Sequence, residues 1–174
     1  MKALLKFWVV ALMLVVNSTA FAESSYPATL EDGNLVLIDG GMGVGKYADR
    51  RSIEVNLYSP PLYQISIDIV PVMFSDEYWR EHGTYIGGPY RISGAFSMIF
   101  RYDWNAKIIS YQRDDNWTVW DIYRSYSHAD GNPLIPNAAE VAFVSAYNMK
   151  FFGDETGYGN YRVIDESLYD ALGI

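Results

Sequence analysis

Residues 52 to 72 constrain the fold more than any other stretch, because apolar and polar side chains alternate along them. The apolar positions are Ile53, Val55 and Leu57 before the pair Pro60-Pro61, and Ile65, Ile67 and Ile69 after it. Side chains leave a β-strand on opposite faces in turn, so this alternation is typical of a strand with one buried face. Two such runs around a short break predict neighbouring antiparallel strands.

Three longer strands are predicted beyond this pair. They are Arg91–Tyr102, Lys107–Arg113 and Trp117–Tyr123, and the turns between them are rich in Asp and Asn. Consecutive strands joined by short turns predict an antiparallel meander. Shorter patterns predict a first strand at 35–38, a helical turn at 76–81, a last strand at 161–164 and a terminal helix at 166–172.

The main helix is predicted over Ala138–Phe152. Asn137 stands where a helix cap is preferred, Glu140 follows three residues later, and Gly153 suits the left-handed residue at the far end. The apolar arc of this helix is wide, so it must pack across a sheet. We therefore predict an α+β domain: a mostly antiparallel sheet of about five to six strands, covered on one face by one main helix near the C-terminus.

The first 22 residues predict a secretory signal peptide. Lys2 and Lys6 give a positive start, residues 7–16 are an unbroken apolar run, and Ala20-Phe21-Ala22 is a small-residue cleavage pattern. Ten apolar residues are too few to cross a bilayer, which takes about 20. We expect cleavage between Ala22 and Glu23, leaving 23–174 as a single exported domain without a transmembrane helix.

The composition of residues 23–174 narrows the functional classes. Two of the 13 basic residues lie in the predicted signal, which leaves 11 against 21 acidic residues, a net charge of −10. A strongly acidic protein repels phosphate backbones, so nucleic-acid binding is not expected. The chain has no cysteine. An exported domain without disulfides fits a bacterium, where it would be secreted or lie in the periplasm or cell envelope.

The chemical motifs are weak. Gly40 and Gly45-Lys46 match the start of a phosphate-binding loop, but Tyr47 stands where a magnesium-binding Ser or Thr is needed, and the following residues predict a strand instead of a helix. His82 and His128 are the two histidines, and no nucleophile-elbow pattern accompanies them. No catalytic residue, metal site or cofactor is predicted.

One set of short patterns resembles a known group of proteins. The set comprises Tyr47-x-Asp49-Arg50, Pro60-Pro61-x-Tyr63-x-Ile65, Trp117, and Ala139-Glu140-x-Ala142-Phe143-x-x-Ala146-Tyr147-x-x-Lys150-Phe151-x-Gly153. It is similar to small secreted proteins of anaerobic bacteria, a family of unknown function, over about residues 44 to 153. The resemblance implies one exported domain and no particular activity.

Candidate binding residues come from the strand faces. With one helix over the sheet, the face that carries Gln64, Ser66 and Asp68 should be wet. Trp117 and Trp120 lie on opposite faces of their strand, so one should pack in the core and the other should be partly exposed. We predict Trp117, Trp120, Gln64 and Asp68 as binding residues, because an exposed indole can stack on a sugar or an apolar side chain.

The expected function is therefore a non-catalytic exported domain that binds an unknown ligand at the envelope or outside the cell. The alternative is a small extracellular hydrolase of glycan or peptide, for which Glu54 and Asp68 are candidate paired carboxylates. An enzyme should gather perturbed acids or a histidine in a cleft, whereas a binding module should show an aromatic patch without them. The sequence leaves the ligand and the oligomeric state open.

Overall fold

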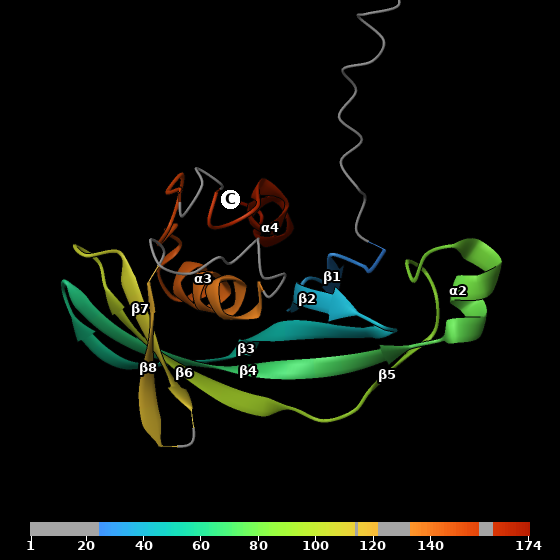
Figure 1. Ribbon diagram of the computed structural model, residues 1–174, viewed down its shortest axis with the longest axis horizontal. Helices are drawn as coiled ribbons and strands as arrows, with labels where there is room; N and C mark the ends of the chain where they lie inside the picture. Colours follow the sequence, from blue (N-terminus) through green and yellow to red (C-terminus); the bar gives the residue numbers. More distant parts are fainter. Residues whose placement is uncertain (1–24, 114, 122–132, 157–161) are drawn as a thin grey trace, which may run out of the picture.

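Two long strands, β3 (Val44–Ser59) and β4 (Leu62–Phe74), form the centre of the sheet (Figure 1). They pair antiparallel from Val44 opposite Met73 to Ser59 opposite Leu62, with irregular register between Asp49 and Glu54 and again between Val55 and Leu57. The alternation around the proline pair therefore predicted this hairpin correctly, although both strands are longer than the pattern.

The structure is a computed structural model that describes residues 25–113, 115–121, 133–156 and 162–174. The predicted signal peptide lies outside the described residues. The remaining elements, in chain order, are β1 (Thr29–Leu30), β2 (Leu35–Gly41), α2 (Asp76–His82), β5 (Tyr90–Ile92), β6 (Phe96–Asp103), β7 (Ile108–Arg113), β8 (Asn116–Asp121), α3 (Leu134–Tyr147) and α4 (Glu166–Leu172).

All strand pairs of the sheet are antiparallel, in the order β1-β2-β3-β4-β6-β7-β8, and β5 also pairs with β4. The α+β class and the meander of β6, β7 and β8 are confirmed. The expected five to six strands were too few, because the described part of the chain forms eight. β1 has two residues and β5 has three, which is too short for alternation to be recognised.

The main helix is shifted from its predicted position. α3 begins at Leu134 and ends at Tyr147, where Asn148 adopts a left-handed φ of 54° and takes the role predicted for Gly153. Asn137 is not the cap; it lies inside the helix and donates from Nδ2 to the Ile38 carbonyl oxygen at 2.9 Å. Pro136 is tolerated so close to the start because first-turn N–H groups have no partner within the helix.

The shorter predictions had mixed outcomes. Helix α2 occupies the region of the predicted helical turn, and α4 follows Asp165, whose carboxylate accepts from the Ser167 N–H at 2.9 Å. In the described part of the predicted strand at 161–164, Arg162 makes an isolated bridge with Thr156, and Val163 and Ile164 lie outside any strand, so the predicted strand is not formed there. The glycine-rich segment is a tight hairpin between β2 and β3 with positive φ at Met42 and Gly43, and a strand follows it.

The larger core lies between the sheet and the helices α3 and α4 (Figure 1). The isoleucines Ile65, Ile67 and Ile69 of β4 point into it and are fully buried. They meet the buried positions of α3, among them Val141 and Phe143. Helix α3 thus covers one face of the sheet, and α4 adds Leu168, Tyr169 and Leu172 to the same core, so the prediction of one main helix is matched only in part.

A second core lies on the opposite side of β4. It is built around Val70, Val72 and Phe74, the even-numbered residues at the C-terminal end of this strand, together with Tyr26 and Tyr85. The buried side of β4 therefore changes along its length, from odd positions near α3 to even positions near α2. The expectation of one uniformly wet face was wrong for this half of the strand, and also for Ser66, which is 7% exposed.

Candidate binding site on the outer face of the sheet

We call the outer face the side of β4, β6, β7 and β8 that is turned away from α3. The register across these strands places Gln64 beside Arg101, Ser66 beside Ile99 and Asp68 beside Ser97. In the meander, Arg101 lies beside Ser110, and Gln112 lies beside Trp117. Alternation along each strand then puts this whole set on one face.

Arg101 is the centre of this face. Its guanidinium carbon lies 3.7 Å from the centroid of the Trp117 ring, and its Nε donates to Gln64 Oε1 at 3.0 Å. A guanidinium stacked on an indole gains cation–π attraction, and the hydrogen bond fixes its rotation. The side chain is exposed and forms no ion pair with a described residue. Its terminal N–H groups are therefore oriented by the protein and directed to solvent.

An open pocket of about 340 Å³ lies next to this cluster, lined by Ser97, Ile99, Gln112 and Asp115. It exists because β6 pairs with β4 along its whole length but with β7 only from Phe100 onward. The β7–β8 hairpin turns away from β6 beyond this point (Figure 1). The pocket lies between Ser97 and Ile99 of β6 and Gln112 and Asp115 of the β7–β8 hairpin.

The two tryptophans separate as predicted. Trp120 is 9% exposed and its ring packs against Phe152, with 5.7 Å between the ring centroids, so it belongs to the core. Trp117 is half-buried on the outer face. Sequence reasoning missed Arg101, which covers one side of the Trp117 indole. The signal was present in the alternation of β6, but the contact depends on the register of three strands.

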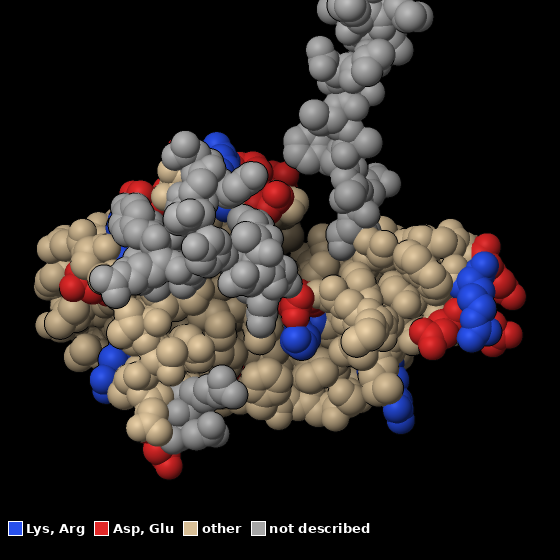
Figure 2. All heavy atoms as spheres, viewed as in Figure 1, with Lys and Arg blue, Asp and Glu red and all other residues tan. Residues whose placement is uncertain are grey.

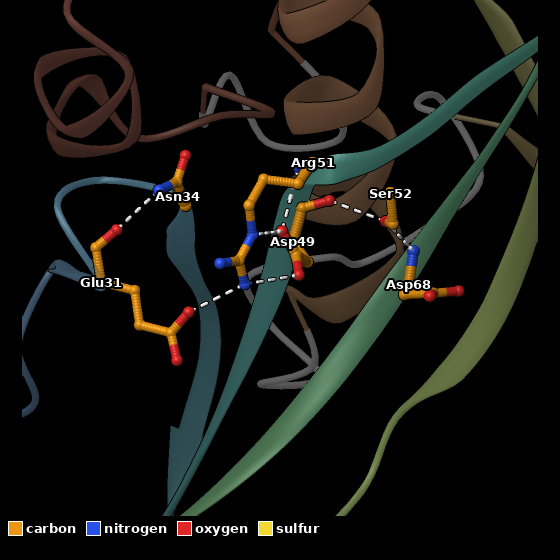
Figure 3. A network of polar contacts seen from close by, with 6 residues as sticks. All are labelled: Glu31, Asn34, Asp49, Arg51, Ser52 and Asp68. Carbon is orange, nitrogen blue, oxygen red and sulfur yellow. Dashed lines mark hydrogen bonds and ion pairs between the residues drawn. The ribbon is translucent and has the colours of Figure 1, made fainter.

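The acidic residues near Asp68 form a structural network (Figure 3). The Arg51 guanidinium donates to both carboxylate oxygens of Asp49 at 2.9 Å and lies 2.8 Å from Glu31 Oε2. The hydrogen bonds and charge of Arg51 lower the pKa of the Asp49 carboxyl group, against a smaller opposing effect of burial. Ser52 Oγ donates to the Asp49 carbonyl oxygen and accepts from the Asp68 N–H, both at 2.7 Å.

These contacts fix the irregular segment of β3 between Asp49 and Glu54. Asp68 enters the network through its main-chain N–H, while its side chain lies on the outer face opposite Ser97. The network is thus occupied with holding the strand. Asp49 stands directly opposite Asp68 in the register of β3 and β4, and its carboxylate is engaged by Arg51.

The buried acid of the structure lies in the core, away from the outer face. Glu140 is 0% exposed, and its carboxylate accepts from the Phe151 N–H at 2.9 Å, the Phe152 N–H at 3.1 Å and the Tyr169 hydroxyl at 2.7 Å. Burial raises the pKa of the Glu140 carboxyl group to about 7, opposed by these hydrogen bonds and by the charge of Lys107. This perturbed acid has no access to a substrate.

The histidines and the possible metal ligands are the remaining groups that could support catalysis. His82 is exposed, stacks on Tyr78 with 4.0 Å between ring centroids, and its Nδ1 lies 3.0 Å from the Tyr78 carbonyl oxygen. His128 lies outside the described residues. Within the described part of the chain, no three His, Cys, Asp or Glu side chains come close enough to hold a metal ion.

Comparison with family models, with curated proteins and with solved structures finds no match to this chain. The resemblance to secreted proteins of anaerobic bacteria therefore stays a prediction. Across the described residues, no helix combines the length and the apolar character needed to cross a bilayer.

Proposed function

We propose that this chain is a non-catalytic exported domain that binds its ligand through the outer face of the sheet, at the cell envelope or outside the cell. The observation that carries the proposal is the fixed position of Arg101. Stacking on Trp117 and a hydrogen bond to Gln64 hold an exposed guanidinium beside an open pocket. Such preorganisation lowers the cost of ordering the side chain when a ligand binds.

The charge at the centre of the outer face suggests what it recognises. The chain as a whole is acidic, with 21 acidic against 13 basic residues, but the group that is fixed on this face is the cationic guanidinium of Arg101. Guanidinium groups bind carboxylates through parallel N–H donors, and these bonds are stronger than neutral hydrogen bonds. The favoured ligand carries a carboxylate for Arg101 and a less polar part for Trp117 and Ile99.

Binding of glycan and peptide arrays by the purified exported chain tests the proposal. Arg101→Gln should weaken binding about ten- to a hundred-fold, because a hydrogen bond to a charged group contributes about 1.5–3 kcal/mol. The matched control is Arg80→Gln on α2, which removes an exposed arginine far along the chain from this face. Equal loss in both variants, or no loss in Arg101→Gln, contradicts the proposal. Turnover of an array component would support a hydrolase instead.

A further inference from the structure

The start of β6 has an unpaired main-chain edge. On one side, Phe96–Ile99 pairs with β4 from Ile69 to Ser66. On the other side, no described strand pairs with these four residues, since β7 joins only at Phe100. An edge of this kind presents a row of N–H and C=O groups without strand partners. Figure 1 shows β5 and β6 along the lower border of the sheet.

Exposed apolar side chains lie beside this edge, together with the polar residues Ser97, Gln112 and Asp115 of the pocket. Phe96 is 46% exposed and Ile92, just before it on β5, is 43% exposed. On the outer face, Ile99 contributes to the pocket beside the edge. In Figure 2 charged side chains cluster over α2 and near the C-terminal region, others lie in the middle of the view and singly along its lower border, and the surface between them is uncharged.

Resting on the proposed function, we propose that the ligand is an extended peptide segment of another protein, which adds a strand to the free edge of β6 at Phe96–Ile99. The added strand would occupy the row that β7 leaves after Tyr111. Four residues of edge span about 13 Å, which suits a segment of about four to six residues. One of its side chains would enter the pocket, and a carboxylate would meet Arg101.

Three observations favour this occupant. The unpaired edge is complementary to alternating donors and acceptors at the spacing of a polypeptide backbone, which an extended strand supplies. The guanidinium of Arg101 stands where this edge ends and β7 begins, so an acidic residue or a terminal carboxylate is complementary to it. The net negative charge of the whole chain disfavours a second copy at the same edge, whereas a short peptide segment needs only the one carboxylate that meets Arg101.

A random library of 12-residue peptides, displayed on phage and panned against the exported chain, supplies the probes. Enriched peptides are synthesised and titrated against variants. Ser97→Lys fills the pocket with a long side chain, which excludes the peptide side chain that would enter it, and should weaken binding at least tenfold. Ser97 is exposed, so the change should leave the fold intact. Thr118→Lys on β8, exposed on the other face of the meander, is the matched control and should change affinity less than twofold.

Hydrogen exchange gives a readout that depends on no substitution. In the free protein, amides of Phe96–Ile99 that face the open edge should exchange rapidly, and bound peptide should slow them at least tenfold. The inference is overturned if no peptide is enriched, if Ser97→Lys and Thr118→Lys bind alike, if protection appears elsewhere, or if self-association protects these amides. Glycan binding that requires Arg101, without peptide binding, would contradict this inference but still support the proposed function. Loss of both would sink both.

Discussion

Replacing Glu140 by Gln should change how the stability of this protein depends on pH. The native carboxyl group has a pKa raised to about 7 by burial, whereas the unfolded chain titrates near the ordinary value of 4.5. Between these two values the native state binds more protons, so rising pH removes stability. Each pH unit in this window corresponds to about 1.4 kcal/mol, which gives about 3 kcal/mol in total.

The structure shows why this group resists ionisation only in part. Desolvation is complete at 0% exposure, but three donors and the nearby Lys107 ammonium favour the charged form. Lys107 itself donates to the Phe151 carbonyl oxygen. Tyr169 and Tyr102 are buried ionisable groups close to Glu140, and burial raises the pKa of both hydroxyls. Glu140→Gln removes the titrating carboxyl group but keeps the size and shape of the side chain. The contributions of the other acids to the pH dependence are then the same in both proteins and cancel in the difference.

Urea unfolding at a series of pH values from 4 to 8 measures the effect. The free energy of unfolding of the wild type, minus that of Glu140→Gln, should fall by about 3 kcal/mol as pH rises through this range. Glu77→Gln removes an exposed carboxyl group from α2 and serves as the matched control. A difference that stays constant from pH 4 to 8, or that grows with pH, refutes the reasoning.

Three further outcomes are expected. Tyr169→Phe removes the hydroxyl that donates to Glu140 at 2.7 Å and should lower the free energy of unfolding by about 1–3 kcal/mol in urea; an unchanged midpoint would contradict this role. Val141→Asp places a carboxylate at a fully buried position of α3 and should cost several kcal/mol, visible by circular dichroism as a large drop in Tm; a melt that matches the wild type would show that α3 is not buried. In acrylamide quenching, Trp117→Phe should remove an accessible component of fluorescence and Trp120→Phe should not, because Trp120 packs in the core; the reverse pattern would exchange their places.

Much of the fold could be predicted from local patterns. The alternating isoleucines of β4 predict the central hairpin because burial of one face imposes a period of two. The helix α3 could be predicted in kind but not in position, since Pro133 and Asn148 act as its ends where Asn137 and Gly153 have the stronger intrinsic preference. Tertiary contacts decided this: the Asn137 amide is used on Ile38.

The site was less predictable for a different reason. Gln64 and Asp68 could be assigned to one face of β4, and Trp117 and Trp120 to opposite faces of β8, from alternation alone. Which tryptophan shares a face with Gln64 could not. Arg101 was missed because its role depends on strand register: it stands opposite Gln64 on β4 and Ser110 on β7, and Trp117 lies one strand further, on β8. Register is a property of paired strands, which a single strand's pattern does not give. Glu140 was interpreted as a capping residue, since only the folded chain brings Phe151, Phe152 and Tyr169 to it.

The change of buried side along β4 makes this strand a shared wall of two compartments. Neither hydrophobic core can unfold without exposing the other, because Ile69 and Val70 are neighbours in the chain and their side chains point into different cores. A chain without disulfides is thereby linked from the core under α3 and α4 to the second core around Val72 and Phe74. The two cores should therefore unfold together as one cooperative unit. The same crossover sets the limit of the ligand-facing surface, which stops where Val70 begins to be covered.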